Sequence, residues 1–293
     1  MPSITIAPPA TFPGRNSRVG RALNMSNRFI AIVRFLGFVL WTLVAMGPYL
    51  VLLAVKPQAC IGYARAYFAR VARICGFRVK VRGALADAGG PVLYVCNHAS
   101  YLDIIVLGSV IEANFVAKAE VAGWPGFGFL ARIARTVFVA RKRGGAATER
   151  DALTQRLKAG DSLMLFPEGT SNDGNRVLPF KSSLFAVAEL TGPDDKPLPV
   201  QPVSVAYTRL DGMPVCRALR PFYAWYGDMT LAGHLLAALG LGEVEIEVIL
   251  HPPVSLADFG NRKALSNHCY DVVNQGVVKA LAGRLDGPVT AAH

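Results

Sequence analysis

A histidine and an aspartate five residues apart follow a short apolar run in residues 95–103, which read VCNHASYLD. If a helix begins near Ser100, His98 lies where strand meets helix, and Asp103 lies just over one turn into the helix. A carboxylate at that place accepts the Nδ1 proton of His98 and leaves Nε2 to take a proton from a hydroxyl or an amine. The spacing therefore allows a general base with its orienting partner, although a histidine and an aspartate at this spacing are, taken alone, more commonly a purely structural pair.

Two other side chains of this stretch have nucleophilic atoms. Cys96 lies two residues before His98, on the same face of an extended strand, which would allow a thiol nucleophile with a histidine base. A cysteine in an apolar strand is more commonly a small buried side chain. Ser100 is better placed to cap the helix than to attack a substrate. Backbone N–H groups near this turn are the expected donors to an oxyanion.

A second polar turn follows the apolar run at 162–166, where the sequence continues as PEGT. Glu168 follows a proline, which makes the turn stiff and acidic. Gly169 lets a ligand approach backbone N–H groups, and Thr170 adds a hydroxyl. A plain turn between strand and loop is the alternative, and the Asn-Asp-Gly triplet at 172–174 fits ordinary turn chemistry.

Short apolar runs alternate with amphipathic stretches after residue 80, as in an α/β domain. Such sheets present functional residues at the carboxyl ends of their strands, where both polar turns lie. Strands are predicted at 91–96, 114–117, 136–140, 162–166 and 200–207, and helices at 147–160 and 181–190. Residues 243–250 alternate Glu with Val and Ile, which predicts a strand with one wet face near an edge of the sheet.

Positive charge is concentrated at the beginning of the chain. The 293 residues include 31 Lys and Arg against 20 Asp and Glu, and residues 1–86 contain twelve of the cations and no acid. A nucleic-acid-binding protein would spread its cations over a reading surface with a recognisable motif. Here they flank an apolar segment, so we expect anionic membrane lipids as partners and no nucleic acid.

That segment, residues 35–55, carries no charge and is long enough to cross a bilayer. Gly47-Pro48 interrupts it near the middle, so we expect a helical hairpin embedded in one leaflet rather than a crossing helix. A signal peptide and a buried core helix are the alternatives. Residues 61–77 form an amphipathic helix whose cations share one side, which favours the headgroup layer. Those cations are Arg65, Arg70 and Arg73.

The cysteines and histidines do not have the spacing of a metal site. The five cysteines are scattered, and none forms a CxxC pair. This argues against a disulfide framework or a structural zinc site and favours a reducing compartment. Histidines 234, 251, 268 and 293 also lack ligand spacing with one another. We expect no metal and no other cofactor.

Four stretches in order resemble the motif blocks of the glycerolipid acyltransferase family, typified by bacterial 1-acyl-glycerol-3-phosphate acyltransferase. They are NHASYLD at 97–103, TVFVARKR at 136–143, FPEGT at 166–170 and VQPV at 200–203, within a matching stretch of about 80–210. The resemblance implies an α/β fold with a mixed sheet flanked by helices, preceded by a membrane-binding helical pair. It also implies acyl transfer from a CoA or acyl-carrier-protein thioester to a lysolipid hydroxyl.

The resemblance also implies roles for single residues. His98 is the base and Asp103 its orienter; Arg141, Glu168, Gly169 and Thr170 bind the acceptor, Lys118 assists, and Pro202 shapes the acyl pocket. One departure is Arg135, because the family usually has a glycine shortly before the strand of the second block. Lys142 and Arg143 also follow Arg141, so three neighbouring cations are available to meet the head group.

Together these patterns predict a one-step transfer in which the histidine deprotonates the acceptor hydroxyl and the thiolate leaves. The expected acceptor is lysophosphatidic acid, with a lyso-ornithine lipid as the alternative and a non-catalytic lipid-binding protein as a further one. We expect a flexible basic tail at 1–27, a membrane segment at 28–79 and the acyltransferase domain at 80–293. The expected location is the cytoplasmic face of the inner membrane, embedded through 28–77.

Overall fold

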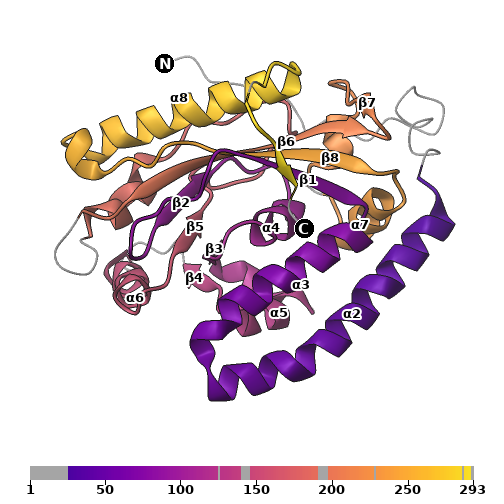
Figure 1. Ribbon diagram of the computed structural model, residues 1–293, viewed down its shortest axis with the longest axis horizontal. Coiled ribbons are helices and arrows are strands. Elements are labelled where there is room, and N and C mark those ends of the chain that lie inside the picture. The colour runs from indigo at the N-terminus through magenta and orange to yellow at the C-terminus, as the bar shows by residue number, and fades with distance from the viewer. Residues whose placement is uncertain are drawn as a thin grey trace, which may run out of the picture.

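A mixed sheet lies at the centre of the computed structural model, which describes residues 26–124, 126–139, 146–190, 197–227, 229–285 and 287–291 (Figure 1). Its main strands follow the order β4-β3-β5-β2-β6-β8-β1-β9, and β7 pairs with the end of β6. The strands from β4 to β6 are parallel, and β8 is antiparallel to β6 and parallel to β1. The bounds are β1 Phe77–Arg82, β2 Leu93–Cys96, β3 Asn114–Lys118, β4 Val137–Val139, β5 Leu163–Leu165, β6 Val200–Leu210, β7 Met213–Pro214, β8 Val244–Leu250 and β9 Thr290–Ala291. The predicted mixed α/β fold is confirmed.

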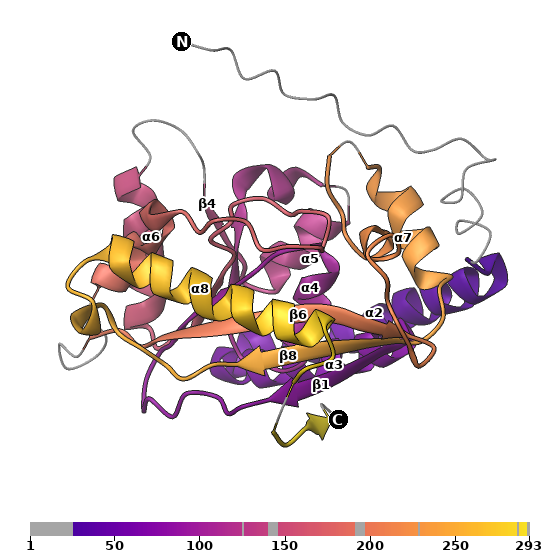
Figure 2. The same ribbon diagram turned by 90° about the horizontal axis from the view of Figure 1, so that it is seen from above.

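Helices cover both faces of the sheet, with α8 along one face and α3 and α4 on the other (Figures 1 and 2). The helices are α2 Arg28–Val55, α3 Cys60–Ile74, α4 Leu102–Gly108, α5 Phe127–Ile133, α6 Ala146–Lys158, α7 Leu231–Leu239 and α8 Arg262–Leu281. Short 3₁₀ segments are η2 Pro57–Ala59, η3 Ala119–Gly123, η4 Ser182–Glu189, η6 Arg220–Phe222 and η7 Leu256–Asp258. The helix predicted at 181–190 is therefore a 3₁₀ segment.

Strand β2 shows why its sequence is apolar without alternation. Leu93 and Val95 belong to the core on the side of α6 and α8, whereas Tyr94 and Cys96 belong to the core on the side of α3 and α4. All four residues are buried. A strand covered on both faces has no wet side, so it holds the loop that follows it rigidly in place.

Strand β8 lies inside the sheet, between β6 and β1, so its predicted place near an edge is wrong. The glutamates that suggested a wet face are paired with cations of β1. Arg78 contacts Glu243 at 2.6 Å, Lys80 contacts Glu245 at 2.5 Å and Arg82 contacts Glu247 at 2.9 Å. The alternating acids thus match alternating cations on the neighbouring parallel strand. These three cations of the basic N-terminal third therefore serve the sheet.

Helices α2 and α3 form the predicted N-terminal pair, but the turn between them is not where we expected it. Helix α2 continues through Pro48, and the chain turns only at η2. The Tyr63 hydroxyl of α3 donates to the carbonyl oxygen of Ala45 at 2.9 Å, in the helical turn before Pro48, which has no backbone N–H to donate. The break predicted at Gly47-Pro48 is therefore wrong, and the hairpin consists of two whole helices.

One side of α2 is bound to the domain and the other is bare. The Arg34 guanidinium donates to three carbonyl oxygens at the end of α7 and just after it, those of Leu239, Leu241 and Gly242. Within the described residues, α2 is the one helix long and apolar enough to cross a membrane. Its exposed apolar side chains are Phe29, Ile32, Val33, Leu36, Leu40, Leu43, Val44, Leu50, Val51 and Val55.

Arg135 stands just before β4 with a backbone φ of 59°, in the left-handed region that glycine adopts most easily. Its guanidinium donates to Asp161 at 3.2 Å and to the carbonyl oxygen of Pro57 at 3.3 Å. The Arg156 side chain donates to its carbonyl oxygen at 3.0 Å. These contacts hold an arginine in the conformation for which the resembled family usually has a glycine.

Candidate active site

Three adjacent parallel strands, β3, β5 and β2, end at the same edge of the sheet. Lys118 is the last residue of β3, the turn at 166–170 follows β5, and His98 follows β2. The topology therefore brings together three stretches that are far apart in the sequence, at the edge where α/β folds carry their sites.

The His98 ring is held by Asp103 as the spacing predicted. The two residues meet at 2.9 Å between Nδ1 and Oδ2, and Asp103 is completely buried whereas the His98 side chain is 20% exposed. The same oxygen accepts the backbone N–H groups of Ala99 at 2.8 Å and Ser100 at 2.9 Å. The other oxygen accepts the Tyr207 hydroxyl at 2.9 Å. A carboxylate fixed by so many donors fixes the ring in turn and leaves Nε2 as the proton acceptor.

The backbone of His98 is fixed from the opposite side by the turn after β5. Its N–H donates to Glu168 Oε1 at 2.9 Å, and its carbonyl oxygen accepts the Asn172 side chain at 3.2 Å and the Asn172 N–H at 3.3 Å. The Phe166 ring stacks on the imidazole with ring centroids 4.1 Å apart. Ring and peptide of His98 are therefore both held by neighbouring residues.

Glu168 is buried behind this contact, with 2% of its surface exposed. Its second oxygen accepts the Asn172 side chain at 2.7 Å and the Leu178 N–H at 3.1 Å. Burial raises the pKa of the Glu168 carboxyl to about 7, and the three donors act against that shift. Both oxygens serve the protein itself, so the structure brings Glu168 to the backbone of His98 and not to the lining of the cavity.

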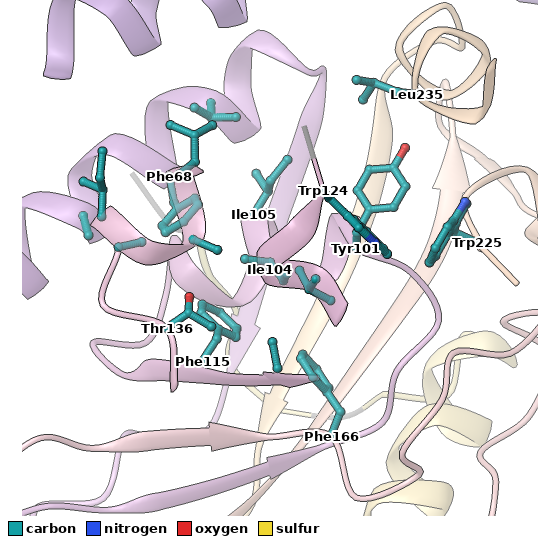
Figure 3. A pocket seen from close by; sticks show the side chains of 18 of the residues that line it. Phe68, Tyr101, Ile104, Ile105, Phe115, Trp124, Thr136, Phe166, Trp225 and Leu235 are labelled. Carbon is teal, nitrogen blue, oxygen red and sulfur yellow. The ribbon is translucent and has the colours of Figure 1, made fainter. Parts of the chain in front are cut away.

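The imidazole opens on an elongated cavity of ≈ 680 Å³ beneath the helical pair. Figure 3 shows Phe68 and Phe115 toward one end and Tyr101, Trp124 and Trp225 gathered toward the other. Most of the lining is apolar or aromatic and comes from α2, α3, α4, β3 and α5. The apolar face of the predicted amphipathic helix α3 therefore lines this cavity, and its three arginines are exposed.

The remaining predicted site residues are divided between the cavity and the sheet. Lys118, Gly169 and Thr170 line the cavity together with His98. Gly169 adopts a φ of 66°, which lets the chain turn sharply after β5. Pro202 lies in β6, paired with Val95 of β2, and is not part of the cavity lining. Arg141, with Lys142 and Arg143, lies outside the described residues.

One expectation for the loop after β2 needs correction. The N–H groups of residues 98–100 are not available to an oxyanion, because Glu168 and Asp103 accept all three. Cys96 is fully buried, and burial raises the pKa of its thiol well above the ordinary value, which opposes a thiolate nucleophile. Ser100 caps the start of α4 by accepting the Leu102 N–H at 3.3 Å.

Two contacts of this site were not predicted from the sequence. Tyr207 lies 104 positions after Asp103, and no local pattern connects the two residues. Asn172 was interpreted as a turn residue, which it is, since its Oδ1 accepts the Gly174 N–H at 2.8 Å. Its Nδ2 also reaches Glu168 and the His98 carbonyl oxygen. Only the position of Asn172 shortly after the polar turn at 166–170 could have suggested that second task.

Comparisons with known proteins agree with this geometry. The model of the family named Acyltransferase matches residues 78–206. The chain is 43% identical over 217 residues to a lyso-ornithine lipid O-acyltransferase of Brucella abortus, covering 73% of this chain and 81% of that protein. It is 31% identical over 177 residues to a 1-acyl-sn-glycerol-3-phosphate acyltransferase of Neisseria gonorrhoeae, covering 60% and 65%.

A solved structure shares the fold. It is the crystal structure of the 1-acyl-sn-glycerophosphate acyltransferase PlsC from Thermotoga maritima, with a TM-score of 0.64 and 20% sequence identity. The match covers 90% of this chain and 100% of that one. The sequence relatives, the shared fold and the family match lead to one conclusion: the chain belongs to the acyltransferase family and is an acyltransferase of lysolipids.

Proposed function

We propose that the protein transfers a fatty acyl group from a thioester of CoA or acyl carrier protein to the hydroxyl of a lyso-ornithine lipid. The observation that carries the reaction type is the His98 ring, held by Asp103 at the mouth of an apolar cavity. The acceptor is proposed from the relatives, because three proteins that are 41% to 43% identical over 71% to 73% of this chain bear that name.

In the proposed step, His98 Nε2 takes the proton of the acceptor hydroxyl while the oxygen attacks the thioester carbonyl. Asp103 holds the Nδ1 proton and stabilises the imidazolium that forms. The C–S bond then breaks, the thiolate leaves, and the proton on the imidazolium returns to it. No covalent acyl-enzyme is needed, in keeping with the burial of Cys96 and Ser100.

The fatty chain of the donor occupies the apolar part of the cavity in this proposal. A volume of ≈ 680 Å³ is within the usual range for a pocket that buries most of a small ligand. The end of the cavity where Phe68 and Phe115 lie presents apolar side chains to a hydrocarbon chain. The thioester end then lies at the polar mouth, beside the imidazole.

The other predicted residues keep acceptor-side roles with one change. Lys118, Gly169 and Thr170 meet the acceptor at the cavity, and Arg141 contributes its charge from the neighbouring segment. We assign Glu168 a positioning role, because its buried carboxylate holds the peptide of His98. Pro202 acts on the cavity only through the sheet, since it pairs with the strand that ends at the site.

We propose that the enzyme lies on the cytoplasmic face of the inner membrane, and the bare face of α2 supports this contact. The ten exposed apolar side chains of α2 enter the acyl region, while Arg34 keeps the helix against the domain. The exposed arginines of α3 meet anionic headgroups. A helix tied to its domain in this way lies along one leaflet rather than across both.

The acceptor is tested in membranes that contain the wild-type chain, with labelled acyl-CoA or acyl carrier protein as donor. Lyso-ornithine lipid and lysophosphatidic acid are supplied in parallel, and the products are separated by mass spectrometry. We expect the diacylated ornithine lipid at a kcat/KM at least about 10-fold above that for lysophosphatidic acid, a difference of about 1.4 kcal/mol. Equal or reversed preference would reject the proposed acceptor.

Lysophosphatidic acid remains the second candidate acceptor, on one specific observation. Lys118 lines the cavity, and three cations follow β4 in the sequence at 141–143, which suits a phosphate head. More distant relatives bear the corresponding name. The same assay separates the two acceptors.

A further inference from the structure

The charged side chains that line the cavity include both signs. Apart from His98, the described lining contains one cation, Lys118, and one anion, Glu120. Both belong to one short segment, in which Lys118 ends β3 and Glu120 lies in the 3₁₀ turn η3 that follows. Glu120 is exposed, so its carboxylate lies at the boundary between cavity and water. No predicted role accounts for this acid.

An acid at this place discriminates between kinds of lipid head. A phosphate monoester carries a charge of about −1.5 to −2 near neutral pH, and a carboxylate beside it is repulsive. A lyso-ornithine lipid has the α-amine of ornithine in amide linkage to a hydroxy fatty acid, so its head keeps a carboxylate and a primary ammonium. We infer that Glu120 binds this ammonium, while Lys118 faces the carboxylate; the inference rests on the proposed acceptor.

Two tryptophans link the segment that contains Glu120 to the loop that contains His98. Trp124 follows η3 directly, lines the cavity and packs edge-on against Trp225 with ring centroids 5.3 Å apart (Figure 3). The backbone N–H of Trp225 donates to the carbonyl oxygen of Ala99 at 2.9 Å, next to His98. Tryptophan is the side chain that best accommodates a cation on its ring face, so the mouth offers the ammonium a carboxylate and aromatic walls together.

The reach of the proposed head fits the sheet. His98 follows β2 and Glu120 follows β3, and β5 alone lies between these strands, so the two ends are about two strand spacings, or roughly 10 Å, apart. With the hydroxyl on the third carbon of the amide-linked acyl chain, nine bonds separate its oxygen from the ammonium nitrogen. Three bonds of an extended chain advance about 3.3–3.6 Å, so these nine span roughly 10 Å as well.

The test compares Glu120→Gln with the wild-type full-length chain in membranes, using two acceptors. One is lyso-ornithine lipid, and the other is the same lipid with its side-chain amine acetylated, which has no positive charge. We expect the variant to raise the KM for the free amine about three- to fivefold, the size of one charge pair at an exposed site, with kcat changed less than about twofold. For the acetylated lipid, wild type and variant should have the same KM.

The matched control is Glu189→Gln, which neutralises an exposed acid outside the cavity lining and should leave every constant unchanged. Equal constants for wild type and Glu120→Gln on the free-amine lipid would overturn the ammonium site while leaving the acyl transfer established. A wild-type enzyme that makes no ornithine lipid would instead reject the proposed acceptor, and the ammonium site with it. The two failures are therefore distinguishable.

Discussion

Asp103 accepts hydrogen bonds from two side chains, His98 and Tyr207, and from two backbone N–H groups. In the proposed reaction, only His98 takes part in the proton transfer. Burial and the nearby Asp103 raise the pKa of Tyr207 well above its ordinary value, so this hydroxyl stays protonated and donates. Each donor to Asp103 lowers the charge that the carboxylate offers to the imidazole and fixes its direction.

Tyr207→Phe removes one of these donors and should lower kcat/KM about 10-fold, since a hydrogen bond to a charged group is worth about 1.5–3 kcal/mol. Without this donor the carboxylate is held less firmly, and the ring of His98 is oriented less firmly for the proton transfer. The measurement is kcat/KM across pH for wild type and variant.

Tyr223→Phe is the control, because Tyr223 stacks on Tyr207 with ring centroids 5.4 Å apart. Its buried hydroxyl has no hydrogen-bond partner within the part of the chain that the structure describes. Its loss should leave kcat/KM within about twofold of the wild type. Equal effects of the two substitutions would reduce Tyr207 to a packing role.

Glu168 gives a prediction for stability against pH. Its pKa is about 7 in the folded chain and 4.5 for the unperturbed carboxyl, so between these values the folded state binds more protons than the unfolded state. The contribution of Glu168 to the free energy of unfolding therefore falls as pH rises from about 4.5 to about 7. Melting temperatures of wild type and Glu168→Gln should show the advantage of the wild type shrinking from about pH 5 to about pH 8. A difference that is constant with pH would refute the raised pKa.

At the scale of elements, the sequence predicts best where the structure is local. The turn that holds His98 against Asp103 lies within a few residues and follows a strand whose apolar run is evident in the sequence. The place of β8 was not predictable in this way. Its alternating glutamates indicated water on one face, whereas the real neighbours are cations of β1 about 165 positions away. The contact between Tyr207 and Asp103 was not predictable either, because the two residues lie 104 positions apart in the sequence.

The ladder between β1 and β8 predicts unequal losses along one sheet. Arg82 and Glu247 have side chains only 16% and 10% exposed, so Glu247→Ala leaves the Arg82 guanidinium with the Gly287 carbonyl oxygen but without its acid and should cost about 1.5–3 kcal/mol. Arg78 and Glu243 are 59% and 48% exposed, so Glu243→Ala should cost less than about 1 kcal/mol. Thermal unfolding of both variants measures the contrast. Equal losses would mean that the inner pair is not buried as described.

At the scale of the whole molecule, the helical pair both exposes an apolar surface and covers the cavity. Helix α2 turns an apolar face outward, and its inner side roofs the cavity together with α3. In the proposed arrangement, a single layer of helix separates the fatty chain from the membrane. The sequence predicted an apolar segment at the membrane, but not that α3 would give its apolar side to the cavity, because helix periodicity does not say what covers a face.

Replacing both Leu40 and Leu43 by Asp should release the protein from vesicles. These side chains are 65% and 69% exposed, and burying a leucine in an apolar phase is worth about 1.5–3 kcal/mol, so the partition constant should fall at least about 100-fold. Leu85→Asp, at a leucine 45% exposed outside the helical pair, is the control and should not change binding. Flotation with anionic vesicles measures the partition. Undiminished binding of the double variant would reject the proposal that α2 contacts the membrane.

We propose that His98, held by Asp103, takes the proton from a lysolipid hydroxyl during acyl transfer. The measurement that tests this role is the rate of labelled acyl transfer from a thioester to lysolipid in membranes carrying wild type or His98→Ala, with folding checked by melting temperature. We expect a loss of at least about 10²-fold, the contribution of a positioned base, with the fold and membrane binding intact. Residual transfer above a few per cent in a well-folded variant would contradict it.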